Sequence, residues 1–263
     1  MNPYLASLNA IVKREALRFI HQRERFIAAL VRPLVWLLVF AAGFRAALGL
    51  SIIPPYQTYI TYETYIVPGL CGMVMLFNGM QSSLSLVYDR EMGSMKLLLT
   101  SPLPRAWLLF CKLMGSTAIS ILQVYAFLAL AAAFGVVMPA VGYLTVLPAL
   151  IVAGLMLGAL GLLLSSFIKQ LENFAGVMNF VIFPMFFVSS ALYPLWKMAE
   201  SSELLYTICA LNPFTQAVEL IRFALYAEFN GLALFWSLIA TIAFTLLALW
   251  GYNPVRTGLA KRG

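Results

Sequence analysis

Six long apolar runs are the feature that most constrains how this chain can fold. At a rise of about 1.5 Å per residue, a helix of about 20 residues crosses a hydrocarbon core of about 30 Å. A strand of a membrane barrel needs only about 10 residues, so longer runs favour helices. The sequence therefore predicts an all-α integral membrane protein with six transmembrane helices. They are expected near residues 31–52, 65–88, 110–137, 143–167, 173–195 and 231–252.

Composition excludes a water-soluble protein. Of the 263 residues, only 10% are charged and 62% are hydrophobic. A soluble domain carries about 25% charged residues, which cover its surface. No polar segment is long enough to form a separate soluble domain. Residues 1–263 are therefore interpreted as a single transmembrane domain embedded in a lipid bilayer.

The net charge of +7 originates in short segments between the apolar runs. Because the basic residues do not cover one folded face, no nucleic-acid partner is predicted. Fourteen of the 17 Lys and Arg residues lie in the N-terminal segment, in 89–112, in 168–172 and in the C-terminal tail. Cytoplasmic loops of membrane proteins carry such an excess. Both termini are therefore predicted to be cytoplasmic, and the pattern is typical of a multi-pass protein of a bacterial inner (cytoplasmic) membrane.

Residues 1–30 combine basic side chains with apolar residues at three- and four-residue steps. This spacing, with one turn missing at Arg23, predicts an amphipathic helix that lies in the cytoplasmic interface and leads into the first span. A plain basic anchor is the alternative. The apolar residues of the pattern are Leu5, Leu8, Val12, Ala16, Phe19 and Phe26.

The longest segment outside the six runs is residues 196–230, which is predicted to lie on the extracytoplasmic side. It holds an apolar stretch from Phe214 to Tyr226, and the preceding Asn212-Pro213 is typical of a helix start. The sequence predicts one or two short helices that dip into the outer leaflet. An ordinary surface helix is the alternative.

The sequence contains no recognisable catalytic or cofactor-binding motif. His21 is the single histidine, and HExxH, GxSxG and the Walker sequence GxxxxGK[ST] do not occur. The chain is therefore not expected to be an enzyme, and no catalytic residue, metal or cofactor is expected on it. Cys71, Cys111 and Cys209 are interpreted as small buried hydrophobic residues. An ATP-independent channel or carrier and a membrane-embedded lipid-modifying enzyme stay open as alternatives.

Two features mark candidate positions of a substrate path. Arg45 lies within the first run, where it either extends to the far interface or lines a path for an anionic or amphipathic substrate. Glu63 is its candidate partner. The fifth run is rich in Phe, and Phe183 and Phe187 are its candidates for contact with a lipid-like substrate. Core packing and interfacial belts are the alternative role of these aromatic residues.

The segment between the second and third runs, residues 89–105, carries the most specific signal. Asp89 is typical of a helix N-cap, and two prolines near the end of the segment stop the helix. Met92, Met95 and Leu99 fall on one helical face. An apolar face in the cytoplasm needs a cover, which either the groove of a soluble partner or the lipid headgroups supply.

The same segment resembles the signature E-R-E-x-G-T-x-E-x-L-L-x-T-P-L-x-R of type-2 ATP-binding-cassette (ABC) export permeases. It departs from that signature at Asp89, Ser94 and Lys96, and the basic Lys96 implies a matching acidic groove on the partner. The resemblance extends along nearly the whole chain through Val67-Pro68-Gly69, through Leu211 to Phe214 and through a later helix with Arg222. The segment itself is Asp89-Arg90-Glu91-x-Gly93-Ser94-x-Lys96-x-Leu98-Leu99-x-Ser101-Pro102-Leu103-x-Arg105.

The resemblance implies that residues 89–105 form the cytoplasmic coupling helix that docks into an ABC ATPase. It implies a permease subunit of an ATP-driven exporter, similar to the lipo-oligosaccharide, polysaccharide and drug exporter branches. An amphipathic, glycolipid-like or hydrophobic substrate is expected. The implied partners are two copies of a separate ATPase, which would bind ATP and magnesium, and a second permease copy or a paralogue. The implied docking residues are Arg90, Glu91, Met92, Gly93, Met95, Lys96, Leu99, Pro102 and Arg105.

Overall fold

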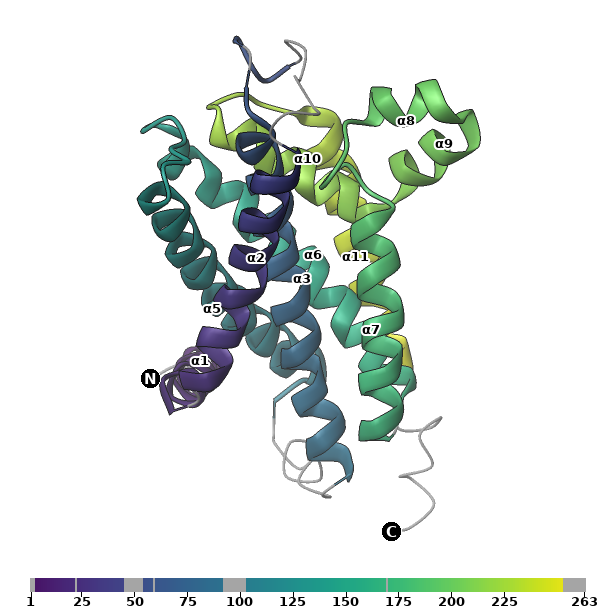
Figure 1. Cartoon of the computed structure of the whole chain (residues 1–263). Coiled ribbons are helices and arrows are strands. Elements are labelled where there is room, and N and C mark those ends of the chain that lie inside the picture. Colours follow the sequence, from purple (N-terminus) through teal and green to yellow (C-terminus); the bar gives the residue numbers. More distant parts are fainter. Residues whose placement is uncertain are drawn as a thin grey trace.

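A computed structural model describes residues 3–21, 23–44, 54–58, 60–91, 103–168 and 170–252. Within these ranges all regular secondary structure is helical, which confirms the predicted all-α class (Figure 1). The helices are α1 (Pro3–His21), α2 (Arg23–Phe44), α3 (Tyr62–Glu91), α5 (Arg105–Ala133), α6 (Gly142–Phe167), α7 (Leu171–Phe187), α8 (Leu195–Ser201), α9 (Glu203–Leu211), α10 (Pro213–Leu225) and α11 (Gly231–Gly251).

Within the described part of the chain, four helices are long and apolar enough to cross a membrane: α3, α5, α6 and α11. They correspond to the second, third, fourth and sixth predicted runs. The pair α9 and α10 is bent by 76° and would count as a fifth span if both helices belong to one crossing. The apolar parts of α2 and α7, which match the first and fifth runs, are shorter: Ala29–Val39 and Leu171–Phe187.

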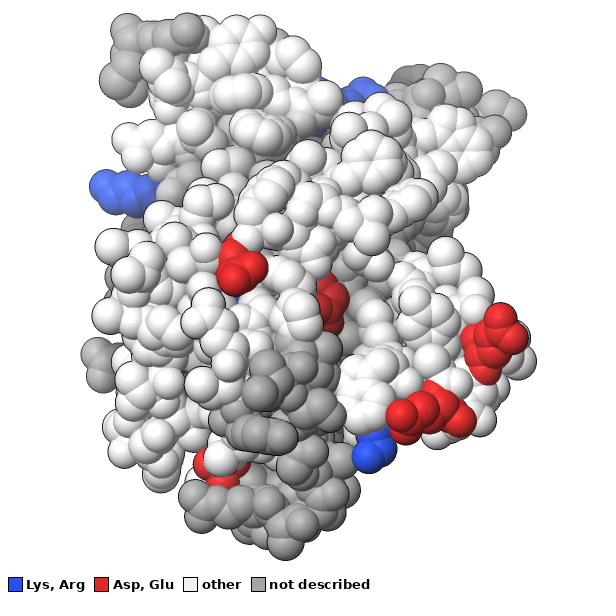
Figure 2. All heavy atoms as spheres, turned by 90° about the horizontal axis from the view of Figure 1, so that it is seen from above, with Lys and Arg blue, Asp and Glu red and all other residues white. Residues whose placement is uncertain are grey.

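Helix α11 shows why this fold suits a lipid environment. It packs along α6, yet much of its outer surface consists of exposed large apolar side chains. Water-soluble monomers rarely expose a continuous patch of this kind. The view from above in Figure 2 shows a surface on which charged side chains are sparse. The exposed apolar residues of α11 are Leu232, Phe235, Trp236, Leu238, Ile239, Ile242, Leu246, Leu247 and Trp250.

Helix α6 is the central helix of the bundle and packs against α3, α5, α10 and α11. Its contact with α3 leaves no room for side chains. A Cβ atom on Gly161 would lie 2.7 Å from the carbonyl oxygen of Gly79, and one on Gly79 would lie 3.0 Å from the backbone of Gly158. Small residues at such crossings let membrane helices approach closely. These glycines therefore set the separation between α3 and α6.

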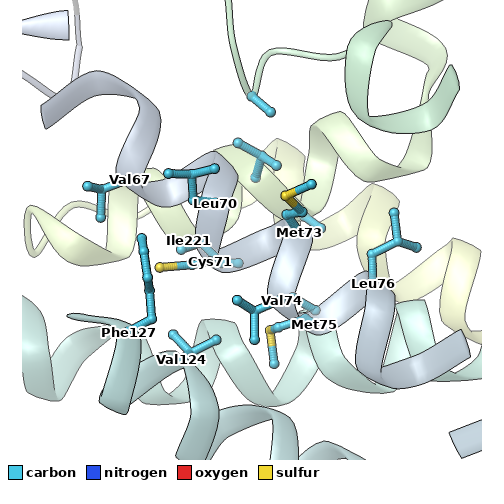
Figure 3. Close-up of a cluster of buried hydrophobic side chains, with 14 of the residues drawn as sticks. Val67, Leu70, Cys71, Met73, Val74, Met75, Leu76, Val124, Phe127 and Ile221 are labelled. Carbon is cyan, nitrogen blue, oxygen red and sulfur yellow. The ribbon is translucent and has the colours of Figure 1, made fainter. Parts of the chain in front are cut away.

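The largest hydrophobic core joins α3, α5, α6 and α10, and Figure 3 shows part of it. Cys71 of α3, Phe127 of α5 and Ile221 of α10 are completely buried in this cluster. Cys71, Cys111 and Cys209 are all free and buried. The prediction that the cysteines act as small hydrophobic residues is therefore confirmed.

The boundary between α1 and α2 differs from the prediction. The sequence predicts one interfacial helix up to residue 30, whereas α1 ends at residue 21 and α2 already begins at residue 23. Figure 1 shows α1 almost end-on, while α2 and α3 run along the bundle. The apolar spacing misses one turn at Arg23, but a missing turn alone does not show that the chain changes direction there. The packing of α1 across α5 supplies the missing information.

Helix α7 ends at Phe187, so the prediction of a span up to residue 195 is wrong at that end. The side-chain Nδ2 of Asn212, the residue that caps α10, donates to the carbonyl oxygens of Met185 and Val188, at 2.8 and 2.5 Å. These bonds satisfy carbonyl groups that a continuing helix would have used itself. The contact with Asn212, which lies more than 20 residues later in the chain, therefore stabilises the end of α7. Hydropathy cannot predict this contact.

The segment 196–230 contains three helices rather than the one or two that the sequence predicts. These are α8, α9 and α10. The predicted helix start at Asn212-Pro213 is confirmed, because Oδ1 of Asn212 accepts a hydrogen bond from the amide of Phe214 at 2.9 Å. Pro213 occupies the first helical turn, where its missing N–H costs nothing. α10 packs against α3, α6 and α11.

Candidate functional site

The predicted coupling segment falls only partly within the described residues. Of its predicted docking residues, those outside them are Met92, Gly93, Met95, Lys96, Leu99 and Pro102. Helix α3 continues through residue 91, so the prediction that Asp89 caps a new helix is wrong. Asp89 and Arg90 instead belong to the last turn of α3, and the exposed Arg105 begins α5. Asp is favoured at N-caps, but Asp89 lies inside α3, which continues past it, so its position in that helix overrides the local preference.

Glu91 connects the end of α3 with the beginning of α7. Its Oε2 accepts a hydrogen bond from the amide of Leu171 at 3.3 Å. A carboxylate at this position satisfies one of the free N–H groups of a helix N-terminus and interacts favourably with the helix dipole. Glu91 is exposed, so it is accessible to a partner as well. The predicted docking end of the molecule is therefore in direct contact with α7.

Helix α1 is attached to α5 by polar contacts. The indole nitrogen of Trp107 donates to Oγ of Ser7 at 3.0 Å, and the ring of Tyr4 packs edge-on against Trp107. Glu15 and Lys112 form an ion pair at 3.7 Å in which both side chains are buried. The alternative of a plain basic anchor is therefore wrong. Helix α1 packs against the first turns of α5 as part of the folded bundle.

The predicted path residues Phe183 and Phe187 lie together on an exposed aromatic surface of α7. Their rings stack with 6.3 Å between centroids, and both side chains are about 40% exposed. Phe183 also contacts Phe77 of α3, and Phe187 contacts Trp36 of α2. We call the surface formed by Trp36, Phe77, Phe183 and Phe187 the aromatic face. Arg45, the third predicted path residue, lies outside the described residues.

A small pocket between α2 and α3, lined by apolar residues and three polar ones, adjoins the aromatic face. The guanidinium of Arg32 lies 3.7 Å from the ring centroid of Phe77, which is a cation–π contact. Asn78 and Gln81 also line this pocket. Sequence reasoning counted Arg32 only as one of the N-terminal basic residues. Arg32 lies inside the apolar stretch 29–39 of α2, and a charged residue in such a stretch could have been recognised from the sequence as a candidate for the site.

At the other end of the molecule, Arg222 of α10 is buried in a network that holds the turn after α7. Its guanidinium forms an ion pair with Glu219, and Nη2 donates to the carbonyl oxygen of Ser190 at 2.7 Å. The same guanidinium lies 4.1 Å from the ring centroid of Tyr65, whose hydroxyl also donates to Ser190 at 2.9 Å. The network therefore ties α3 and α10 to the C-terminal end of α7.

The two ends of α7 are thus held by different parts of the chain. Glu91 contacts its N-terminus, and Asn212 and the Arg222 network hold the residues at its C-terminus. Between these points Phe183 and Phe187 are exposed, whereas Phe77 behind them is buried. Among the described residues, no group of three or more His, Cys, Asp or Glu residues is placed to hold a metal ion.

Comparison with known proteins identifies the family. A family model described as "ABC-2 type transporter" matches residues 6–226, from α1 to just after α10. "Putative transport permease ycf38" of Porphyra purpurea is 30% identical over 223 residues, which cover 83% of this chain and 74% of that protein. The protein of the same name from Cyanophora paradoxa is 29% identical over 236 residues, covering 87% and 77%. The chain therefore belongs to the ABC-2 type transporter family of membrane permeases.

Proposed function

We propose that this chain is the permease subunit of an ATP-driven exporter whose energy comes from a separate ABC ATPase. Family membership makes the chain a transport subunit rather than an enzyme. The structural observation that supports coupling is the contact between Glu91 and Leu171, which links the proposed docking end to α7 and its aromatic face. In this proposal ATP and magnesium bind to the partner ATPase, and the permease responds with a change of conformation.

The ATPase docks on the segment 89–105. Met92, Met95 and Leu99 supply apolar contacts, while Arg90, Glu91, Lys96 and Arg105 supply polar ones. Gly93 permits close approach of the two backbones, and Pro102 directs the chain back toward α5. Two ATPase copies serve two permeases, which are either two copies of this chain or this chain and a paralogue. Closure of the ATPase dimer pushes the end of α3, and Glu91 transmits this push to α7.

The substrate path runs along the aromatic face. The exposed rings of Phe183 and Phe187 offer apolar surface, and Arg32 in the adjoining pocket attracts polar groups, which suits an amphipathic, glycolipid-like or hydrophobic molecule. Phe183 and Phe187 contact the substrate, and a second permease closes the path from the other side. The distribution of Lys and Arg supports an orientation with both termini on the cytoplasmic side of a bacterial inner membrane.

The test is purification of the tagged full-length chain from native membranes, followed by cross-linking mass spectrometry. A P-loop ATPase is expected to co-purify and to cross-link to Lys96. Met95→Asp or Leu99→Asp is expected to abolish this association, because a carboxylate cannot be buried in an apolar groove without a partner. Leu204→Asp is the matched control, since Leu204 is an exposed apolar residue on α9 at the opposite end.

Each outcome decides between specific alternatives. If both docking variants keep the ATPase and transport at the level of the control, the docking assignment is wrong. If no ATPase co-purifies and Lys96 cross-links only within this chain, an ATP-independent channel or carrier becomes the better interpretation.

A further inference from the structure

A buried ion pair joins α1 and α5, the helix that begins at the proposed docking end. Glu15 is the only acidic residue of α1, and Lys112 is the only basic residue of α5 after its first position. Their charged groups lie 3.7 Å apart, and their side chains are only 7% and 5% exposed. Well-packed apolar residues in place of a buried ion pair often give equal or greater stability. The transport proposal does not yet give this pair a role.

Lys112 also contacts a third helix. Its Nζ donates a hydrogen bond to Oγ of Ser85 on α3. The hydroxyl of Ser85 donates its own proton to the carbonyl oxygen of Ser82 at 2.7 Å, so its oxygen is free to accept from the ammonium group. A single side chain of α5 is therefore bonded to both α1 and α3.

This contact lies close to the segment 89–105, on which the ATPase docks in the proposed function and which we call the docking segment. Ser85 lies about two helical turns before the end of α3 at Glu91, and Lys112 lies about two turns after the start of α5 at Arg105. The bond between Lys112 and Ser85 thus connects the two helices from which the docking segment extends. A displacement of this segment then moves both helices together instead of separating them.

Helix α1 is attached to α5 much more extensively than to α2, its neighbour along the chain. Near the start of α1, Ser7 accepts the hydrogen bond from Trp107. Farther along, a Cβ atom on Gly115 would lie only 3.4 Å from Cγ of Glu15. A glycine at such a crossing lets two helices approach closely. Helix α2 packs mainly against α3 instead, so α1 and α2 have different principal partners.

The ion pair restricts how α1 can move. Apolar contacts are not directional, so they allow two helices to slide along each other. A buried charge that loses its partner is strongly unfavourable, and buried ionic groups can therefore fix the register of helices. Helix α1 cannot shift along α5 without separating Glu15 from Lys112.

We propose that Lys112 is a positioning residue for coupling, which joins α1, α3 and α5 into one unit. This inference rests on the proposed function, because it assigns α1 to the movement that the ATPase drives. When the ATPase displaces the docking segment, α1 moves together with α5, and its position relative to α2 changes. Glu15 and Lys112 contact neither ATPase nor substrate, and they act through the helices that they hold.

The first arm of the test uses the full-length chain in nanodiscs without an ATPase, in a background without native cysteines. Spin labels at Asn9→Cys on α1 and Ala118→Cys on α5, both exposed positions, report the distance between these helices by double electron–electron resonance. A single narrow distribution is expected. Lys112→Met and Glu15→Gln are each expected to broaden it roughly twofold, because each leaves one buried charge unpaired. Lys197→Met, at an exposed cation on α8, is the control.

Two further variants separate positioning from simple packing. Glu15→Lys/Lys112→Glu keeps an ion pair in reversed order and is expected to restore the narrow distribution. Ser85→Ala is the milder variant, since it removes one hydroxyl and keeps the ion pair. It is expected to leave the distance from α1 to α5 narrow and to broaden the distance from Tyr88→Cys on α3 to Ala118→Cys. Unchanged distributions in both Lys112→Met and Glu15→Gln would overturn the proposal.

The second arm uses the complex with its co-purified ATPase, with and without ATP, magnesium and vanadate. The distance from Asn9→Cys to Ala118→Cys is expected to stay constant, whereas the distance from Asn9→Cys to Val35→Cys on α2 shifts. Val35 is 49% exposed, so a label is tolerated there. In Lys112→Met the ATPase is expected to co-purify as before, because the docking segment is unchanged, but the shift relative to α2 is lost.

The outcomes distinguish this inference from the proposed function. If nucleotide changes the distance from α1 to α5 and not that to α2, or changes neither distance, the positioning role of Lys112 in coupling is wrong. If no ATPase co-purifies, the proposed function fails and the coupling role fails with it. The first arm contains no ATPase, so its failure counts against the contact at Lys112 alone.

Discussion

Arg222 places a positive charge inside the protein, where only 3% of the residue is exposed. A buried charge is tolerated when it is paired and its remaining donors are used. Glu219 supplies the counter-charge, and the carbonyl of Ser190 accepts one further donor. The sequence shows Arg222 only as a basic residue in a helix, and its partners lie up to about 160 residues away along the chain, at Tyr65.

Replacement of Arg222 by Met is expected to lower the free energy of unfolding by about 3–5 kcal/mol, because it leaves the charge of Glu219 without its partner. The double variant Arg222→Met/Glu219→Gln is expected to recover part of this loss. Thermal unfolding of the full chain in nanodiscs measures both. Lys197→Met is the control at an exposed cation of the same end. A single variant as stable as this control would contradict the structural role of Arg222.

The glycine contact between α3 and α6 provides a second prediction at the residue scale. Gly161→Ala is expected to destabilise the protein by about 1–3 kcal/mol, because its Cβ would overlap the backbone of Gly79 and force the helices apart. Gly176→Ala is the matched control, since a Cβ there meets nothing within 4 Å. Equal thermal unfolding midpoints for the two variants would show that the crossing tolerates a wider separation.

At the scale of elements, α7 is held both by buried side chains along its length, such as Ile182 and Phe186, and by contacts at its two ends. It reaches α3 through Phe183 and Phe77, while much of its remaining surface is exposed. Its C-terminus is set by Asn212 and its N-terminus by Glu91. Hydropathy located this helix but placed its end eight residues too far along, since the capping side chain comes from another element.

Loss of the Glu91 carboxylate is expected to loosen the first turn of α7. Glu91→Ala should make amide hydrogen exchange at Leu171 and its neighbours several-fold faster, since such a contact contributes about 0.3–1 kcal/mol. Glu200→Ala is the control, because Glu200 is an exposed carboxylate on α8, at the opposite end of the molecule. If Glu91 acts only in contact with the ATPase, exchange in α7 will be unchanged in the isolated chain and this interpretation fails.

At the scale of the whole molecule, large apolar side chains are exposed on several helices, and two of these surfaces differ in their neighbours. One is the outer surface of α11, which consists of aliphatic and aromatic residues suited to lipid. The other is the aromatic face with its neighbour Phe180, which is 78% exposed. Arg32 borders only the second surface. Arg32 lies over Phe77, which is buried, so the exposed part of this face is the stacked pair Phe183 and Phe187, and we propose that this face rather than α11 meets the second permease.

This difference predicts which surface faces the second permease. In a background without native cysteines, Phe180→Cys is expected to form a disulfide-linked dimer under mild oxidation, whereas Leu246→Cys on α11 is not. Both parent residues are exposed, at 78% and 60%, so exposure alone does not separate them. Non-reducing gel electrophoresis of membranes measures the result. Efficient cross-linking at position 246 alone would place α11 at the interface and contradict the proposed path.

The sequence by itself determined the class of protein and much of its helical layout. A long apolar run in a bilayer is stable as a helix, because a helix satisfies its backbone hydrogen bonds internally. This reasoning located α3, α5, α6 and α11, and the helix start at Asn212 followed from local capping chemistry. The signature of residues 89–105 indicated the family.

Only the tertiary structure decided the features that depend on distant partners. These are the break between α1 and α2, the end of α7, the contact of Glu91 with Leu171, and the contacts of Lys112 with α1 and α3. The physical reason is the same in each case. Helix propensity and hydropathy are local properties, whereas a hydrogen bond or an ion pair joins groups that the sequence keeps far apart.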